Sequence, residues 1–313
     1  MPINRIVGLW RVLKETFAGF IEHKVPKLSG SLAYYTVFSM GPLLLMIISF
    51  CGLFFGREAV EGNIYAQLEG FVGHDTALQL QHIIKNASIS GKSILSAVIG
   101  GVTLLIGATG VFAEIQDSIN MIWGLKAKPK KGLIIFLRTR ILSFSVIASL
   151  GFLLLVSLGI SALIESFSSR LQTAYPHVTV TIFYIINILL TFVITTAIFG
   201  VVFKVLPDAK ISWKDVTAGA IATALLFMLG KFAISYYISK INIGTTYGTA
   251  GSLVILLLWI YYSSIILYFG AEFTKVYALS SGKAIHPSQY AVTTQQVQVE
   301  TGKAPVQPTV ITH

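Results

Sequence analysis

The chain has 313 residues, of which 54% are hydrophobic and only 12% are charged, and its mean hydropathy is +0.76. A soluble domain carries about 25% charged residues, so roughly half of the usual water-facing complement is missing. This composition excludes a disordered chain, a secreted disulfide scaffold and an ordinary cytosolic enzyme. The single cysteine, Cys51, leaves no intramolecular disulfide or thiolate metal cluster within this sequence.

Residues 1–28 precede the first long apolar stretch and contain an amphipathic pattern. Apolar side chains recur at helical spacing opposite a basic face, which predicts a helix at the membrane surface or, as an equal alternative, a helix packed on the rest of the protein. Pro26 provides a corner into the first span. The apolar positions are Ile6, Leu9, Trp10, Leu13, Phe17, Phe20 and Ile21, and the charged ones are Arg5, Arg11, Lys14 and Glu15.

Six long stretches are almost free of charge, and a charge at the centre of a bilayer costs roughly 2.5–3.5 kcal/mol. A helix of about 20 residues crosses about 30 Å of hydrocarbon, and a lone segment in lipid must be helical. We therefore predict an all-α polytopic membrane protein with six transmembrane helices. In the fifth span, Lys231 is explained by snorkelling. The spans cover about residues 29–56, 93–114, 139–164, 178–204, 214–239 and 246–275.

Two segments lie outside the predicted spans. Residues 57–92 form an external loop with two short amphipathic patterns, which is either a structural cap or a lid over a cavity. Residues 281–313 are rich in Thr, Gln, Val and Pro without helical periodicity, so we expect a disordered tail.

The 23 Lys and Arg side chains are distributed unevenly when the loops are numbered alternately. Most fall in the amino-terminal segment, in the loop at residues 126–140, in the connection at 204–214 and in the tail. By the positive-inside rule both termini are predicted to be cytoplasmic, and the first span is expected to act as its own insertion signal. The net charge of +10 then reflects topology and contact with anionic lipids rather than binding to nucleic acid.

Ionisable and amide side chains gather near the predicted cytoplasmic ends of the spans, at one depth. Such groups are costly there and are usually paired or functional. Two interpretations stay open: a structural network of buried ion pairs, or a binding or gating site. The members of this cluster are Glu114, Asp117, Asn120, Arg138, Arg140, Lys204 and Glu272.

Glycines form a second pattern. Gly107 and Gly110 in the second span, and Gly248 and Gly251 at the start of the sixth, predict close helix packing. Gly41 and Pro42 predict a kink in the first span. Kinks and glycine-rich helix starts are also features of moving transporter helices.

No motif supports a catalytic centre, a metal or a cofactor. Gly91-Lys92-Ser93 lacks the glycine and the preceding strand that a phosphate-binding loop requires. The six histidines have no zinc-ligand spacing, and no nucleophile elbow is present.

Several stretches together resemble the YihY/BrkB family of bacterial inner-membrane proteins, historically mislabelled as ribonuclease BN. The resemblance covers roughly residues 10–280 and implies six spans with cytoplasmic termini, but no reaction. The ribonuclease label has no support in these residues, which lack a metal-ligand cluster. The matching stretches are residues 33–39 with Pro42; 107–114 with Gln116, Asp117, Asn120 and Trp123; Leu206-Pro207-Asp208 with Trp213, Gly219 and Ala220; and 247–252 through 259–262 to 270–274.

The leading hypothesis is a transporter or translocase of an amphiphilic or anionic molecule, such as a lipid or envelope precursor, because little of the chain lies outside the membrane. Without an ATP motif, uphill transport would have to use an ion gradient. The second hypothesis is a membrane scaffold or assembly factor, and the third, an intramembrane enzyme, lacks a nucleophile or metal. Membrane lipids are the expected partners, and self-association into a homo-oligomer stays open.

Overall fold

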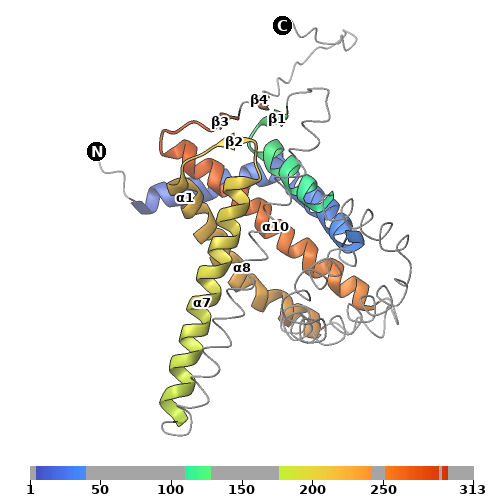
Figure 1. Cartoon of the computed structure of the whole chain (residues 1–313), viewed down its shortest axis with the longest axis vertical. Helices are drawn as coiled ribbons and strands as arrows, with labels where there is room; N and C mark the ends of the chain where they lie inside the picture. Colours follow the sequence, from blue (N-terminus) through green and yellow to red (C-terminus); the bar gives the residue numbers. More distant parts are fainter. Residues whose placement is uncertain (1–4, 40–109, 128–175, 241–250, 289–290, 295–313) are drawn as a thin grey trace, which may run out of the picture.

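The computed structural model describes residues 5–39, 110–127, 176–240, 251–288 and 291–294, and these are mostly helical (Figure 1). Helices without a label cover residues 25–39 and 110–122. The labelled elements are α1 (Arg5–Glu22), β1 (Leu125–Ala127), α7 (Pro176–Val205), β2 (Ala209–Lys210), α8 (Trp213–Lys240), α10 (Gly251–Ser280), β3 (His286–Pro287) and β4 (Ala291–Thr293).

The three long helices form a layered arrangement in which α8 contacts both α7 and α10, while α1 packs on α10. In Figure 1, α7 runs lengthwise, and α1 lies across it near the end where the four short strands gather. We call this end the strand end.

Helix ends at the strand end follow local sequence signals. Ser212 precedes α8, and its carbonyl accepts from the amides of Asp215 and Val216, while the Asp215 carboxylate lies in the positively polarised first turn. Beyond α10, Gly282 has φ 71°, and the amide of Lys283 donates to the carbonyl of Ala278 at 3.2 Å. This bond closes a glycine-terminated helix end, and it requires a left-handed residue that glycine supplies without steric cost.

The strands form two antiparallel pairs, β1 with β4 and β2 with β3. They bring residues 286–287 and 291–293 back to the ends of α7 and of the helix at 110–122, respectively. The expectation of a disordered tail from residue 281 is therefore wrong for these residues. Their order comes from main-chain pairing with β1 and β2, which a periodicity argument does not detect.

The helices correspond to parts of the predicted spans. α7 covers 178–204 and α8 covers 214–239, whereas α10 continues past residue 275 to Ser280, and the helix at 110–122 continues past residue 114. Among the described residues, two helical segments are long and apolar enough to cross a membrane, Ile188–Val205 and Leu253–Ser280. The third span, the external loop and most of the first and second spans lie outside the described residues.

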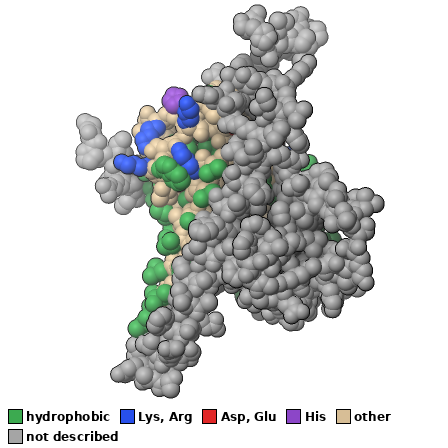
Figure 2. Space-filling model, viewed as in Figure 1, with side chains coloured by type: hydrophobic (Ala, Val, Ile, Leu, Met, Phe, Trp, Pro, Cys, Tyr) green, Lys and Arg blue, Asp and Glu red, His purple; other side chains and the backbone are tan. Residues whose placement is uncertain are grey.

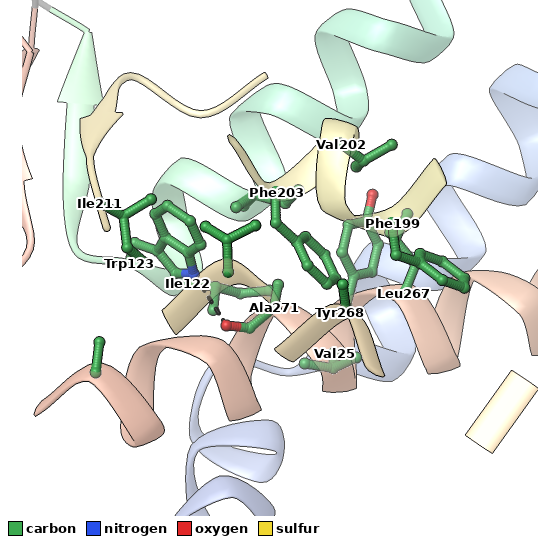
Figure 3. Close-up of a cluster of buried hydrophobic side chains, with 14 of the residues drawn as sticks. Val25, Ile122, Trp123, Phe199, Val202, Phe203, Ile211, Leu267, Tyr268 and Ala271 are labelled. Carbon is green, nitrogen blue, oxygen red and sulfur yellow. Dashed lines mark hydrogen bonds between the residues drawn. The ribbon is translucent and has the colours of Figure 1, made fainter. Parts of the chain in front are cut away.

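A buried apolar cluster ties these helices together at the strand end (Figure 3). Tyr268 and Phe203 are fully buried at its centre. Between helices in a membrane, such side chains stabilise the assembly through close van der Waals packing. The cluster also includes Val25, Leu32, Ile119, Ile122, Trp123, Phe199, Val202, Val216, Leu267 and Ala271.

The interface between α8 and α10 is built from two matching glycine and threonine pairs. A Cβ at Gly219 would collide with the side chain of Thr274, and a Cβ at Gly270 would collide with that of Thr223. Each threonine hydroxyl donates to the carbonyl of the glycine four residues earlier in its own helix, at 2.6 Å in α8 and 2.7 Å in α10. The antiparallel helices therefore interlock reciprocally, and no hydroxyl of this set is left unpaired.

Helix α1 has three distinct faces. Val12, Thr16 and Gly19 are buried and face the protein, which agrees with the expectation of a packed helix. Arg11 and Glu15 form an exposed ion pair at 2.8 Å. A third face is apolar and exposed, so contact with a bilayer stays a prediction for Leu9, Trp10, Leu13, Phe17 and Ile21.

Candidate functional site

An amide and a carboxylate join two segments at the strand end. The side-chain nitrogen of Asn120 donates to Oδ2 of Asp208 at 3.1 Å, and the Asp208 amide donates back to Oδ1 of Asn120 at 2.9 Å. Gln116 donates to the same carboxylate oxygen at 3.1 Å, and the Ser288 amide donates to the Asp208 carbonyl. Asp208, which lies in the bend after α7, is thus the hub of a network that reaches the helix at 110–122 and the tail.

The helix at 110–122, which carries Gln116 and Asn120, also carries acidic and hydroxyl side chains close to Asp208. Burial, the Glu114 carboxylate and then Asp208 raise the pKa of Asp117, which lies beyond the predicted second span. Like charges and partial desolvation both disfavour the ionised form. Tyr268 on α10 lies within electrostatic range of Glu114 and Asp117 and close to Ser118, and its buried hydroxyl has no hydrogen-bond partner of good geometry among the described residues.

The end of the helix at 110–122 is fastened to α10. The indole nitrogen of Trp123 donates to the carbonyl of Ala271 at 2.9 Å (Figure 3). The ammonium of Lys275 donates to the carbonyl of Ile122 at 2.7 Å. Lys275 satisfies a carbonyl that a helix end leaves without a partner, and its charge complements the negative end of the helix dipole.

Glu272 is the most deeply buried carboxylate of the predicted cluster, with a side chain 1% exposed. Its Oε1 lies 2.8 Å from Nδ1 of His23, which also lies 3.0 Å from the carbonyl of Gly19. Because both neighbours are acceptors, we place the proton on Nδ1. Oε2 of Glu272 is buried and has no hydrogen-bond partner among the described residues.

Gly19 makes room for this carboxylate. A Cβ at residue 19 would collide with Oε1 of Glu272, so α1 approaches α10 closely at this point. The bond from His23 then closes the turn after α1 over the same side chain. The glycine gap and the hydrogen bond to a carboxylate therefore add to the apolar packing of Val12 on Phe273 and Val276 between α1 and α10.

Lys204 points away from the carboxylates of the predicted cluster. Its ammonium donates to the carbonyl of Ile211 and lies 5.4 Å from the centroid of the Trp213 ring. These contacts stabilise the connection between α7 and α8. Whether Lys204 belongs to a structural network or to a binding site stays a prediction.

The structure thus divides the predicted cluster. Glu114, Asp117 and Asn120 share one helix near Asp208, whereas Glu272 is paired with His23 in a separate contact. Arg138 and Arg140 lie outside the described residues.

Of the predicted packing residues, Gly110 has only ordinary contact with the ring of Tyr35, and Gly251 is buried. Gly41, Pro42, Gly107 and Gly248 lie outside the described residues.

Several residues that build the site were not in the predicted cluster. Asp208, Gln116 and Trp123 belong to the stretches that carry the family resemblance, which was the available signal. His23 had a weaker signal, since it follows an amphipathic helix by one residue. Among the described residues, no group of three or more His, Cys, Asp or Glu side chains is placed to hold a metal ion.

Comparison with known proteins identifies the family. A family model described as virulence factor BrkB matches residues 16–291. The chain belongs to this family. The match includes α1 from Thr16 onward, the Asp208 hub, Glu272 and strands β1 to β3, so the candidate site lies within the shared region of the BrkB family.

Relatives of this chain include UPF0761 membrane proteins. The chain is 25% identical over 286 residues to a UPF0761 membrane protein of Saccharophagus degradans, covering 91% of this chain and 63% of the relative. It is 26% identical to one of Ralstonia nicotianae, with 80% and 55% covered, and 26% identical to one of Pseudoalteromonas atlantica, with 79% of each covered. The chain thus spans less than two thirds of the first two relatives. No solved structure matches it.

Proposed function

We propose that this integral membrane protein moves an amphiphilic or anionic molecule across the bacterial inner membrane, and that Glu272 belongs to the route or to the machinery that gates it. The observation that carries the proposal is a carboxylate 1% exposed on an apolar helix, with one oxygen unpartnered among the described residues. Ionisable groups inside membrane proteins are costly and are retained mainly where they serve function. A purely structural ion pair would be expected to satisfy both oxygens.

Neighbouring groups support the same interpretation. The Tyr268 hydroxyl, one helical turn before Glu272, is also buried without a partner of good geometry among the described residues. Glu114 and Asp117 approach it from the adjacent helix. Polar groups with unused hydrogen-bonding capacity at the end of apolar helices can exchange partners with a passing polar headgroup at low cost.

A second candidate function, a membrane scaffold, is favoured by different observations. The Asp208 carboxylate and amide are both engaged by Asn120, and the glycine and threonine pairs of α8 and α10 are closely interlocked. A rigid, internally satisfied bundle of this kind suits a protein that holds partners in place. The two functions differ in whether the unpartnered polar atoms matter.

Reconstitution of the full chain into liposomes tests the proposal. Fluorescent phosphatidylglycerol and phosphatidylcholine would be followed as they move between leaflets, with and without an imposed proton or sodium gradient. We expect acceleration of the anionic lipid above protein-free liposomes. Folded protein that accelerates neither lipid nor a panel of anionic solutes would favour the scaffold, especially if a partner co-purifies at fixed stoichiometry.

A further inference from the structure

Basic side chains from separate segments meet at the start of α8. Lys210 in β2 lies directly opposite His286 in β3, and both are exposed. Lys214 is exposed in the first turn of α8, and Lys283 reaches the same turn from the end of α10. We call Lys210, Lys214, Lys283 and His286 the basic surface. Figure 2 shows Lys, Arg and His side chains gathered at this end of the described surface, with no acidic side chain visible on that face.

Nearby carboxylates neutralise only one member of the basic surface, Lys283. Asp215 is 2% exposed and is occupied by Lys283, at 2.7 Å and 3.0 Å. Asp208 is engaged by the network around Asn120. Within the described part of the chain, Lys210 and Lys214 make no ion pair. Two exposed ammonium groups therefore remain available to an external anion.

The flank of α8 next to the basic surface is apolar. Trp213 is 59% exposed, and Ile221, Leu225 and Leu229, which are 39%, 50% and 69% exposed, follow one another at intervals of four residues. The exposed Thr217 lies between Trp213 and Ile221. Residues four apart are neighbours on a helix surface, so Ile221, Leu225 and Leu229 form an apolar stripe that winds gradually round α8. Trp213 lies at the start of the same helix, and tryptophan is enriched where a membrane protein crosses from hydrocarbon to headgroups.

We propose that the basic surface binds the phosphate headgroups of anionic phospholipids while their acyl chains lie along the α8 stripe. Charge complementarity selects the phosphate, and the adjoining apolar strip selects a lipid over a nucleic acid or an acidic protein, neither of which supplies acyl chains. Lys204, held against the Trp213 ring, keeps that ring at the junction. The inference stands without the proposed transport, because a headgroup site can serve a transporter or a scaffold.

Lipid retention by the purified full chain tests the inference. Phosphatidylglycerol and phosphatidylcholine would be titrated separately, and the bound lipid measured by native mass spectrometry. We expect a preference for phosphatidylglycerol that falls about five-fold for Lys210→Gln or Lys214→Gln alone and about 25-fold for both, since each basic group near the surface contributes about that factor. The pair Lys210→Arg and Lys214→Arg should keep the preference.

The matched control is Lys126→Gln, an exposed lysine on β1 outside the basic surface, which should leave the preference unchanged. Thermal unfolding would confirm that each variant is folded. An unchanged preference in the double glutamine variant, or an equal loss in the control, would overturn the inference. It would also be overturned if the double variant lost binding to an oligonucleotide duplex while it retained phosphatidylglycerol.

Discussion

Helix α10 packs closely against both α8 and α1 at glycines, and polar side chains fill the space beside these glycines. The two contacts differ in whether the hydrogen-bonding groups of those side chains have partners. Against α8, two of the side chains at glycine gaps are Thr223 and Thr274, and each of their hydroxyls donates within its own helix. The side chain of Tyr262 fills a third gap, at Gly230 of α8. Against α1, the intruding side chain is Glu272, whose one engaged oxygen depends on His23 of another segment. The α8 contact carries its own hydrogen bonds, whereas the α1 contact is only half satisfied.

Because of this difference in hydrogen bonding, we expect the α8 contact to behave as packing and the α1 contact to behave as part of a functional site. A self-satisfied contact loses stability when its shape changes and gains nothing from an external ligand. A half-satisfied carboxylate costs stability in the resting protein, and a ligand or a rearrangement that supplies the missing partner would recover that cost. Substitutions that alter one contact at a time distinguish these two behaviours.

The largest effect is expected at the α8 contact. Gly270→Ala places a Cβ against the buried side chain of Thr223, and overpacking of this kind costs about 1–3 kcal/mol. Thermal unfolding in detergent would measure the loss, and Thr223→Ala in the same chain should restore part of it. The matched control is Gly30→Ala, where no atom lies within 4 Å of the new Cβ, so stability should hold or rise by about 0.5–1 kcal/mol. Equal losses at both glycines would contradict the interlocking account.

An intermediate effect is expected at the Asp208 hub. Asn120→Ala removes the donor to the Asp208 carboxylate and the acceptor of its amide, which should cost about 1–2 kcal/mol because two hydrogen bonds to a half-buried residue are lost. Gln116→Ala removes one bond and should cost less. Chemical unfolding of the three proteins would rank them, and a larger loss for Gln116→Ala would show that Asn120 is not the central link.

The smallest effect is expected at Asp117, and it depends on pH. Its folded-state pKa lies above the ordinary value of 3.8, so the folded protein holds this proton more tightly than the unfolded chain does. Stability is therefore lost as pH rises through the window above 3.8, where the unfolded carboxyl ionises first. Asp117→Asn should match the wild type below that window and exceed it in stability at neutral pH. An opposite trend would mean that Asp117 has a cationic partner.

The sequence predicted helices better than it predicted contacts. Charged residues bound the apolar stretches, so the limits of α7 and α8 follow within one or two residues of the predicted spans. Asn120 and Glu272 were identified because polar groups near span ends are uncommon. Their partners were not, because Asp208 and His23 lie 88 and 249 residues away along the chain and meet them only through tertiary packing.

The short strands were missed for a related reason. Pairs of two or three residues, such as His286–Pro287 with Ala209–Lys210, have too little length for an alternating pattern. Their order depends on the ends of α7 and α10 coming together. The close glycines at 19, 219, 230 and 270 were likewise hidden, because only the position of the facing helix distinguishes them from open ones such as Gly8.

The most direct test of the account compares Glu272→Gln with wild type in the liposome assay. Glutamine keeps the size of the side chain and a carbonyl oxygen for His23, so the unfolding temperature should change by only a few degrees. The account predicts that the variant, although folded, loses most of the accelerated movement of phosphatidylglycerol, while Gly30→Ala keeps it. A folded Glu272→Gln protein that moves the lipid as fast as the wild type would contradict a functional role for this carboxylate.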